Sequence, residues 1–273
     1  MIRSPLLSLS NGSTIPQVGL GLWQVRDETQ FQIAFDAAID AGYRHFDSAQ
    51  AYRNEAMLGR AVASCGVSRK ELFITTKIRT ESIALGKTAK SFDKSLSDLK
   101  MDYVDLLLLH FPVPFARKNA WKELEKIHKA GKAKNIGVSN YTIRHLEEMK
   151  KYAAIMPMVN QVELHVFLQQ PELLDYCVKE GIIIEAYSPL AHAKVMDNVV
   201  VQSIADKHAV SYGQVMLRWC VQKDLVVLPK SVTPNRIRDN IDVFDFALDD
   251  SDMLALSAIN KNLRTCWDPT IVP

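Results

Sequence analysis

The sequence predicts an α/β protein, a (β/α)8 (TIM) barrel that begins with an N-terminal β-hairpin. Eight short apolar runs alternate with amphipathic stretches at intervals of roughly 20–40 residues, as in repeated βα units. The chain has 273 residues, close to the ~250 residues of such barrels. No Gly/Ser-rich or Pro-rich linker divides it, so residues 1–273 are expected to form a single domain.

The first elements are strands. Residues 7–9 and 14–15 flank an Asn11-Gly12 turn and predict the hairpin. The apolar runs that follow are rich in Val, Ile, Leu or aromatic residues, which is typical of strands buried on both faces. They predict strands at 18–20, 43–46, 72–76, 104–109, 133–138, 158–162, 182–186 and 225–228.

The stretches between the strands predict helices. In residues 27–41, for example, Phe31, Ala34 and Phe35 fall on one face. Several stretches begin at a capping Thr, Asn or Ser and end at a glycine, as helices do. The expected helices are 27–41, 54–64, 87–99, 119–130, 142–150, 171–179 and 234–243.

An open, doubly wound sheet is the competing architecture. Its dinucleotide-binding loop carries three spaced glycines after the first strand. Gly19 and Gly21 are present here, but Gln24 stands in place of the third glycine, and Trp23 would crowd a pyrophosphate. The closed barrel is therefore favoured.

Composition excludes several classes of protein. The 33 Lys and Arg balance 31 Asp and Glu, for a formal net charge of +2, and without a basic run no nucleic-acid partner is expected. No apolar stretch reaches the roughly 18 residues of a membrane span. The N-terminus lacks the apolar region of a secretory signal, and the four cysteines show no metal-binding or paired spacing. We expect a cytoplasmic protein without a membrane partner or a metal site.

Polar residues directly follow several of the predicted strands. In such barrels the active site lies at the carboxyl ends of the strands. Each residue taken alone is equally compatible with a strand cap, but together they predict one shared cavity. The titratable residues at these positions are Asp47, Lys77, His110, Tyr187 and Lys230.

Three kinds of chemistry fit Asp47, Lys77 and His110. Metal binding is disfavoured because the lysine cation repels a divalent metal. A Schiff-base lysine, as in an aldolase, suits Lys77 at a strand end. The third is proton donation by Tyr52, a phenol whose pKa of about 10 a neighbouring ammonium would lower.

Three motifs resemble the aldo-keto reductase family. They are GYRHFDSA at 42–49, followed by Glu55 and Leu58-Gly59; KNIGVSNY at 134–141; and LPKS at 228–231, followed by Arg236 and Asn240. The resemblance runs from GLGLW at 19–23 to the C-terminal tail and is greatest to aldose-reductase-like and 2,5-diketogluconate-reductase-like members. It implies a (β/α)8 barrel that reduces aldehydes and ketones to alcohols with NADPH.

The resemblance also implies a catalytic tetrad of Asp47, Tyr52, Lys77 and His110. Tyr52 would give a proton to the developing alkoxide. Lys77, paired with Asp47, would lower the pKa of the phenol, and His110 would orient the carbonyl oxygen. An intact tetrad disfavours the aldolase and also an inactive, redox-sensing binding protein.

The cofactor implied by the resemblance is NADPH/NADP+. Ser139, Asn140 and Gln161 would hold the carboxamide, and Tyr187 would stack on the nicotinamide. Two cations and hydroxyls at a helix start suit a 2′-phosphate, so NADPH is expected over NADH; a solvated basic edge is the alternative. The other expected cofactor residues are Gly21, Leu22, Trp23, Ser188, Leu190, Lys230, Ser231, Val232, Thr233, Arg236 and Asn240.

The substrate is expected to be a small-molecule carbonyl compound. Its aromatic pocket would be formed by Trp23, Tyr52, His110, Phe111 and Trp267, although Trp267 is equally compatible with packing the tail onto the barrel. The segment 190–198 is short and predicts a weak clamp over the cofactor. A monomer is expected.

Overall fold

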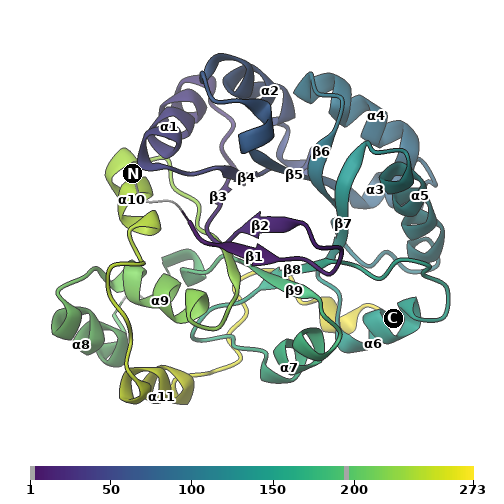
Figure 1. Ribbon diagram of the computed structural model, residues 1–273. Helices are drawn as coiled ribbons and strands as arrows, with labels where there is room; N and C mark the ends of the chain where they lie inside the picture. The colour runs from purple at the N-terminus through teal and green to yellow at the C-terminus, as the bar shows by residue number, and fades with distance from the viewer. Residues whose placement is uncertain (1–3, 194–196) are drawn as a thin grey trace.

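The computed structural model describes residues 4–193 and 197–273 and confirms the barrel (Figure 1). Eight parallel strands form one sheet in which each strand pairs with the next along the chain. They are β3 (Leu20–Gly21), β4 (His45–Asp47), β5 (Phe73–Ile78), β6 (Val104–Leu109), β7 (Ala133–Ser139), β8 (Val159–Glu163), β9 (Ile183–Tyr187) and β10 (Val226–Leu228).

Backbone hydrogen bonds join the last strand to the first. Gly19 N donates to Val227 O (2.9 Å), and Val227 N donates to Gln17 O (2.8 Å). The predicted first strand, 18–20, is displaced to β3, residues 20–21, and Val18 forms only an isolated bridge with Val227.

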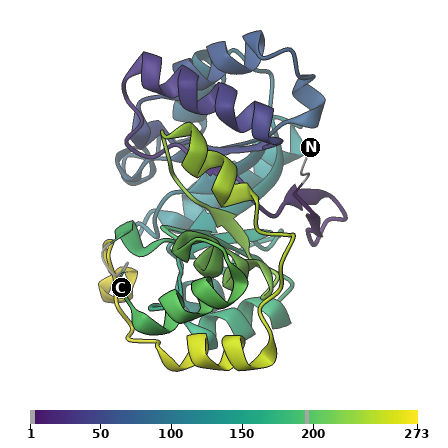
Figure 2. The ribbon, with the colours of Figure 1, turned by 90° about the vertical axis from the view of Figure 1, so that its left-hand side faces the viewer.

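The expected hairpin consists of β1 (Leu6–Ser8) and β2 (Thr14–Pro16). It lies across the centre of the strand ring in Figure 1, beside His45 at the start of β4. In Figure 2 the hairpin and the C-terminal end of the chain lie on opposite sides of the barrel. The C-terminal tail is therefore on the side to which the carboxyl ends of the strands point.

Helices surround the strands. The seven predicted helices are present, with ends displaced by at most two residues. They are α1 (Glu28–Ala41), α2 (Glu55–Ser64), α4 (Thr88–Leu99), α5 (Arg117–Lys129), α6 (Ile143–Met149), α7 (Pro171–Lys179) and α10 (Pro234–Ile241). None of the helices in residues 4–193 and 197–273 is both long and apolar enough to cross a membrane.

Four helices were not predicted: α3 (Thr80–Ala84), α8 (Val199–His208), α9 (Tyr212–Val221) and α11 (Asp250–Ala258). α9 buries seven of its ten residues, so its sequence lacks the one-sided pattern that indicates a surface helix. The segment 190–198, expected to form a short clamp, includes residues 194–196, which lie outside the described residues.

The interior of the barrel contains polar side chains. Side chains alternate along a strand, so His45 and Asp47 of β4 point the same way, as do Thr75 and Lys77 of β5. All four are buried, and His45 lies within hydrogen-bond distance of Thr75 while Lys77 contacts Asp47. The strand register therefore brings ionisable groups together on the barrel axis.

Candidate active site

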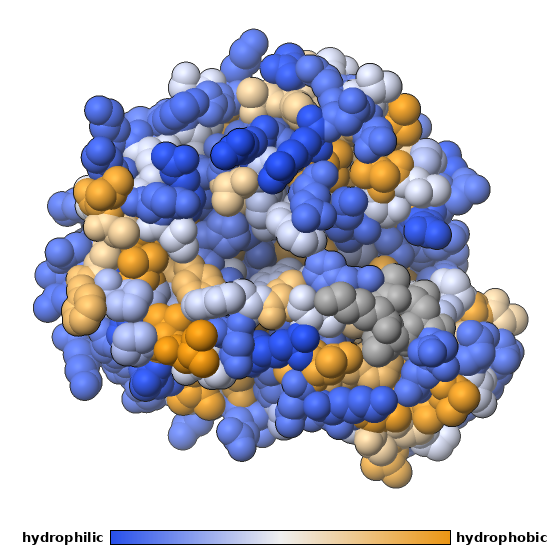
Figure 3. Space-filling model, turned by 180° about the vertical axis from the view of Figure 1, so that it is seen from behind, coloured by the Kyte–Doolittle hydropathy of each residue, from blue (hydrophilic) through white to orange (hydrophobic). Residues whose placement is uncertain are grey.

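A cavity of about 1040 Å³ opens at the carboxyl ends of the strands. The face opposite the hairpin, shown in Figure 3, is hollowed near its centre. The cavity is lined by these predicted site residues: Gly21, Trp23, Tyr52, His110, Phe111, Ser139, Asn140, Gln161, Tyr187, Ser188, Leu190, Lys230, Ser231, Val232, Thr233, Arg236, Asn240 and Trp267.

Three predicted residues lie outside the cavity wall. Asp47 and Lys77 lie beneath the cavity, buried in the barrel. Lys77 is linked to the cavity wall by its hydrogen bond to Tyr52. The Leu22 side chain is fully buried in the core, and its backbone N–H donates to Asp47 O (3.0 Å). The structure thus gives Leu22 a packing position and no contact with the cavity.

A hydrogen-bonded chain runs from the barrel interior to Tyr52. Lys77 Nζ donates to both carboxylate oxygens of Asp47 (2.8 and 2.6 Å), to Ser48 O (3.0 Å) and to Tyr52 Oη (3.1 Å). The Tyr52 and His110 rings meet edge-on with centroids 5.7 Å apart. The four residues of the expected tetrad are therefore in contact at one end of the cavity.

The loop that carries Tyr52 is held by Asn54. Tyr52 lies in the 3-10 turn Gln50–Tyr52 that follows β4. The Asn54 amide donates to Leu22 O (2.8 Å) and Val25 O (3.0 Å) and accepts a hydrogen bond from Ser48 Oγ (2.7 Å). Because Asn54 is wholly buried, these bonds fix the tyrosine loop against the loop that follows β3.

Burial corrects one sequence-based expectation. Lys77 lowers the pKa of Tyr52 as expected, but burial raises it more, so this pKa lies above its ordinary value. Burial lowers the pKa of Lys77, but the interactions with Asp47 and Tyr52 raise it by more, so the pKa of the lysine lies above its ordinary value. Tyr52 is consequently a neutral phenol beside a stable ammonium.

His110 is neutral as well. Burial, followed by the charge of Lys77, lowers the pKa of His110 to about 3. A neutral imidazole donates from one ring nitrogen and accepts at the other. His110 therefore offers the cavity a hydrogen bond without a charge.

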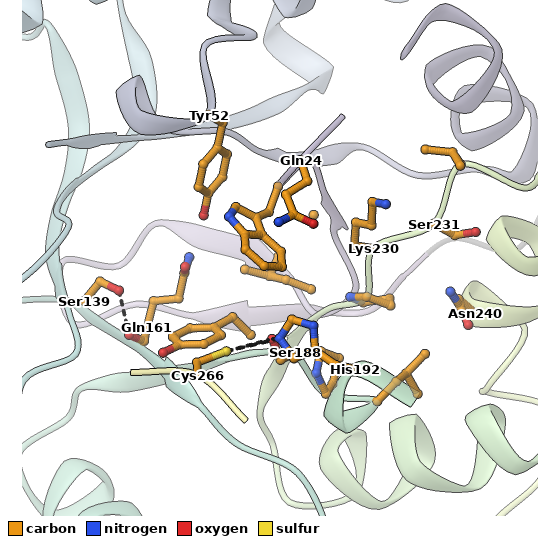
Figure 4. A pocket seen from close by; sticks show the side chains of 18 of the residues that line it. Gln24, Tyr52, Ser139, Gln161, Ser188, His192, Lys230, Ser231, Asn240 and Cys266 are labelled. Atoms are coloured by element: carbon orange, nitrogen blue, oxygen red, sulfur yellow. Dashed lines mark hydrogen bonds between the residues drawn. The ribbon is translucent and has the colours of Figure 1, made fainter. Parts of the chain in front are cut away.

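The residues expected to hold a carboxamide form a hydrogen-bonded network, of which Figure 4 shows the bond made by Ser139. Ser139 Oγ donates to Gln161 O (2.9 Å), and Tyr187 Oη donates to Asn140 Oδ1 (2.8 Å). Asn140 Nδ2 donates to His110 O (3.1 Å) and Ser139 Oγ (3.1 Å). Neighbouring strand ends thus present fixed amide and hydroxyl groups beside the tetrad.

The other end of the cavity carries two cations beside the carboxylate of Asp239. Lys230 and Arg236 line it where α10 begins, and neither makes an ion pair within residues 4–193 and 197–273. Ser231 Oγ accepts from Thr233 N (3.1 Å) and shapes the turn before the helix. Helix N-termini with cations and hydroxyls are sites for anions.

Aromatic side chains form the mouth. Phe111 and Trp267 lie with ring centroids 4.1 Å apart, and Trp23 meets His192 at 5.3 Å. Trp267 is half exposed and lines the cavity. It therefore forms part of the mouth and does more than pack the tail onto the barrel.

His192 and Cys266 lie at the cavity edge but were not among the predicted site residues. His192 Nε2 lies 3.0 Å from Ser188 Oγ and 3.1 Å from Cys266 Sγ, at the cavity edge. Residues 192 and 266 are far apart in the sequence and only the fold brings them together, so no local motif could predict their contact. In the described part of the chain, no group of three or more His, Cys, Asp or Glu residues is arranged to hold a metal ion.

Glu163, at the end of β8, anchors the tail that carries Trp267. It accepts hydrogen bonds from Thr265 N (2.7 Å), Thr265 Oγ1 (2.5 Å) and Cys266 N (3.1 Å). Burial opposes ionisation, but the hydrogen bonds from His165 and the tail lower the pKa of Glu163 to about 2. The anchor is therefore a carboxylate at neutral pH.

Replacing Glu163 with alanine is expected to lower the free energy of unfolding by about 2–3 kcal/mol, because two tail N–H groups and a hydroxyl lose a charged acceptor. Urea unfolding measures this change. Glu28→Ala, which removes an exposed ion pair with Arg60, is the control and should cost less than about 1 kcal/mol. Equal losses in the two variants would contradict the anchoring role.

A tyrosine hydrogen-bonded to a buried lysine–carboxylate pair, at the open end of a (β/α)8 barrel, is the arrangement that the resemblance to a class of carbonyl oxidoreductases implies. Residues 17–261 match the model of the aldo/keto reductase family, and the protein belongs to this family. It is 45% identical over 263 residues to the glyoxal reductase of Bacillus subtilis (strain 168), covering 96% of this chain and 95% of that protein. It is 38% identical over 273 residues to a methylglyoxal reductase of Escherichia coli O157:H7, covering 98% of each.

Solved structures agree with these relatives. An aldo-keto reductase from a Medee basin deep-sea metagenome library superposes with a TM-score of 0.94 at 38% identity, covering 98% of this chain and 99% of that one. The Bombyx mori aldo-keto reductase in complex with NADP gives a TM-score of 0.92 at 32% identity, covering 97% and 95%.

Proposed function

We propose that the protein reduces aldehydes and ketones to alcohols with NADPH, and that small α-oxoaldehydes are among its substrates. The observation that carries this proposal is the 3.1 Å hydrogen bond from Lys77 Nζ to Tyr52 Oη beneath the cavity. The names of the glyoxal and methylglyoxal reductases to which the chain is similar support the substrate class.

The donor set fits a nicotinamide dinucleotide phosphate. Neutral amide and hydroxyl groups lie at one end of the cavity, and two cations without an ion-pair partner in the described residues lie at the other. Ser139, Asn140 and Gln161 would hold the carboxamide, and the Tyr187 ring would form the wall beside it. Lys230, Ser231, Thr233 and Arg236 would hold the 2′-phosphate, with Asn240 near the adenine. When bound, NADPH supplies the hydride for the carbonyl carbon.

Tyr52 would protonate the carbonyl oxygen. Lys77 donates to Tyr52 Oη, so the hydroxyl hydrogen is free to point toward a substrate. As the proton leaves, the ammonium stabilises the phenolate, and Asp47 keeps the ammonium in place. His110, neutral and edge-on to Tyr52, would donate a second hydrogen bond that orients the carbonyl.

The Schiff-base alternative is disfavoured by the position of Lys77. Its Nζ is fully buried and donates to Asp47, Ser48 and Tyr52. Attack on a carbonyl needs an uncharged and accessible amine, and here the pKa of Lys77 is raised. Borohydride treatment with substrate is expected to trap no adduct.

The test is an assay of NADPH oxidation with a panel that includes glyoxal, methylglyoxal and an aromatic aldehyde. We expect the absorbance of the reduced nicotinamide to fall only when an aldehyde is present. Tight NADPH binding without turnover of any aldehyde would support the alternative of a redox-sensing binding protein.

A further inference from the structure

Glu185 is an ionisable side chain inside the barrel that the mechanism above does not use. It lies in β9 and is wholly buried. Its Oε2 accepts a hydrogen bond from Gln161 Nε2 (3.0 Å), whereas its Oε1 has no hydrogen-bond partner within residues 4–193 and 197–273. His45 Nε2 lies 3.6 Å from this oxygen, beyond hydrogen-bond distance.

No cation forms a hydrogen bond with Glu185 within residues 4–193 and 197–273. Lys77 directs its hydrogen bonds to Asp47, Ser48 and Tyr52. His45 faces Pro16 O and Thr75 Oγ1, and burial lowers its pKa to about 3. A buried carboxylate without a cation is strongly disfavoured.

The neighbouring elements act in opposite directions on a charge at Glu185. Asp47 of β4 repels it, whereas Lys77 of β5 and the hydrogen bond from Gln161 of β8 favour it by less. His45 of β4 is neutral, and Val226 of β10, beside Glu185 in register, is apolar. Burial, and then repulsion from Asp47, raises the pKa of Glu185 to about 8. Glu185 is therefore protonated at neutral pH.

Glu185 also fixes the amide of Gln161. Gln161 Nε2 donates to Asp47 Oδ1 (3.0 Å) and to Glu185 Oε2 (3.0 Å), which uses both of its hydrogens. Gln161 lines the cavity, and Figure 4 shows its side chain extending toward the region of Tyr52. What remains for a ligand is the amide oxygen, so Glu185 sets which atom of Gln161 can bind.

We propose that Glu185 is a positioning residue for the reaction, an inference that rests on the proposed reductase function. As a neutral acid it orients the Gln161 amide and leaves a single carboxylate charge, on Asp47, opposite Lys77. When it ionises, a second negative charge joins the site, Tyr52 holds its proton more tightly, and aldehyde reduction slows.

The first test compares pH profiles of kcat for aldehyde reduction at saturating NADPH. The wild type is expected to lose activity as pH rises through about 8, since Glu185 then ionises, while the raised pKa values of Tyr52 and Lys77 keep both protonated there. Glu185→Gln should keep kcat at neutral pH within about threefold, a loss well below the 10²–10⁴-fold of a removed general acid. The kcat of Glu185→Gln should also not fall as pH rises through about 8.

Glu55→Gln is the matched control. Glu55 is also buried with a raised pKa, but it lies on α2 and accepts from Thr76 Oγ1 (2.6 Å) outside the barrel interior. This variant should keep the alkaline decline. An unchanged decline in Glu185→Gln would overturn the proposal. A wild type that reduces no aldehyde would instead overturn the proposed function, and the positioning role with it.

Stability provides a readout apart from activity. A group whose pKa is raised by folding stabilises the protein below its unfolded value, here 4.5, and this contribution is lost as pH rises to about 8. The urea midpoint of Glu185→Gln relative to wild type should therefore increase across this interval. A constant difference would show that Glu185 is already ionised and would overturn the proposal.

The wild type alone provides a third readout if Glu185→Gln does not fold. Infrared spectra should contain the carbonyl band of a protonated, buried carboxylic acid at neutral pH, and the band of Glu185 is the one that persists in Glu55→Gln. This band should vanish as pH rises through about 8. Its absence at neutral pH would overturn the proposal.

Discussion

Replacing Tyr52 with phenylalanine is expected to lower kcat for aldehyde reduction by about 10²–10⁴-fold, the usual contribution of a general acid. The variant keeps the aromatic ring against His110 but has no proton to give and no oxygen to accept from Lys77. NADPH affinity should change little, because the residues proposed to hold the cofactor are untouched. Initial rates and fluorescence titration with NADPH measure the two effects separately.

Tyr176→Phe is the control for this experiment. Tyr176 also hydrogen-bonds a neighbour, donating to Glu147 Oε1 (2.5 Å), but it lies on α7 at the surface. This variant should reduce aldehydes at the wild-type rate. Turnover of Tyr52→Phe near the wild-type rate would remove Tyr52 from the role of proton donor.

Replacing Lys230 or Arg236 with alanine is expected to weaken NADPH binding by about 10–100-fold each. Charge-assisted hydrogen bonds contribute about 1.5–3 kcal/mol, and 1.4 kcal/mol is a tenfold change in affinity. NADH, which lacks the 2′-phosphate, should lose much less. Binding titrations with both nucleotides give the ratio directly.

Arg238→Ala tests whether the effect is specific. Arg238 lies on the same helix, α10, and donates to Asn235 Oδ1 (3.0 Å) at the surface. Its loss should leave both affinities unchanged. If Lys230→Ala and Arg236→Ala weaken NADH as much as NADPH, the 2′-phosphate assignment is wrong.

The strands were predictable because most of them are buried on both faces and are rich in apolar residues. β6, for example, has the predicted bounds, Val104–Leu109. β3 was displaced because Leu20 and Gly21 pair with β4, whereas Val18 forms only an isolated bridge with Val227, a tertiary pairing that no local pattern contains. α9 escaped prediction because tertiary packing buries it on nearly all sides.

The sequence predicts the part of the candidate site whose residues lie at strand ends. Asp47 and Lys77 follow two neighbouring strands, so their contact followed from parallel pairing. The direction of the Tyr52 pKa did not follow, because the sequence contains the neighbouring charge but not the extent of burial. Glu185 was hidden inside the apolar run 182–186, where one carboxyl among aliphatic residues looks like part of a buried strand.

A crystal structure with NADP+ and a bound aldehyde tests the central assignment most directly. We expect the carbonyl oxygen within about 3 Å of Tyr52 Oη, a hydrogen-bond distance, with His110 as its second donor and Lys77 still bonded to the phenol. A carbonyl bound away from Tyr52, or a Tyr52 hydroxyl turned from both Lys77 and the cavity, would contradict it.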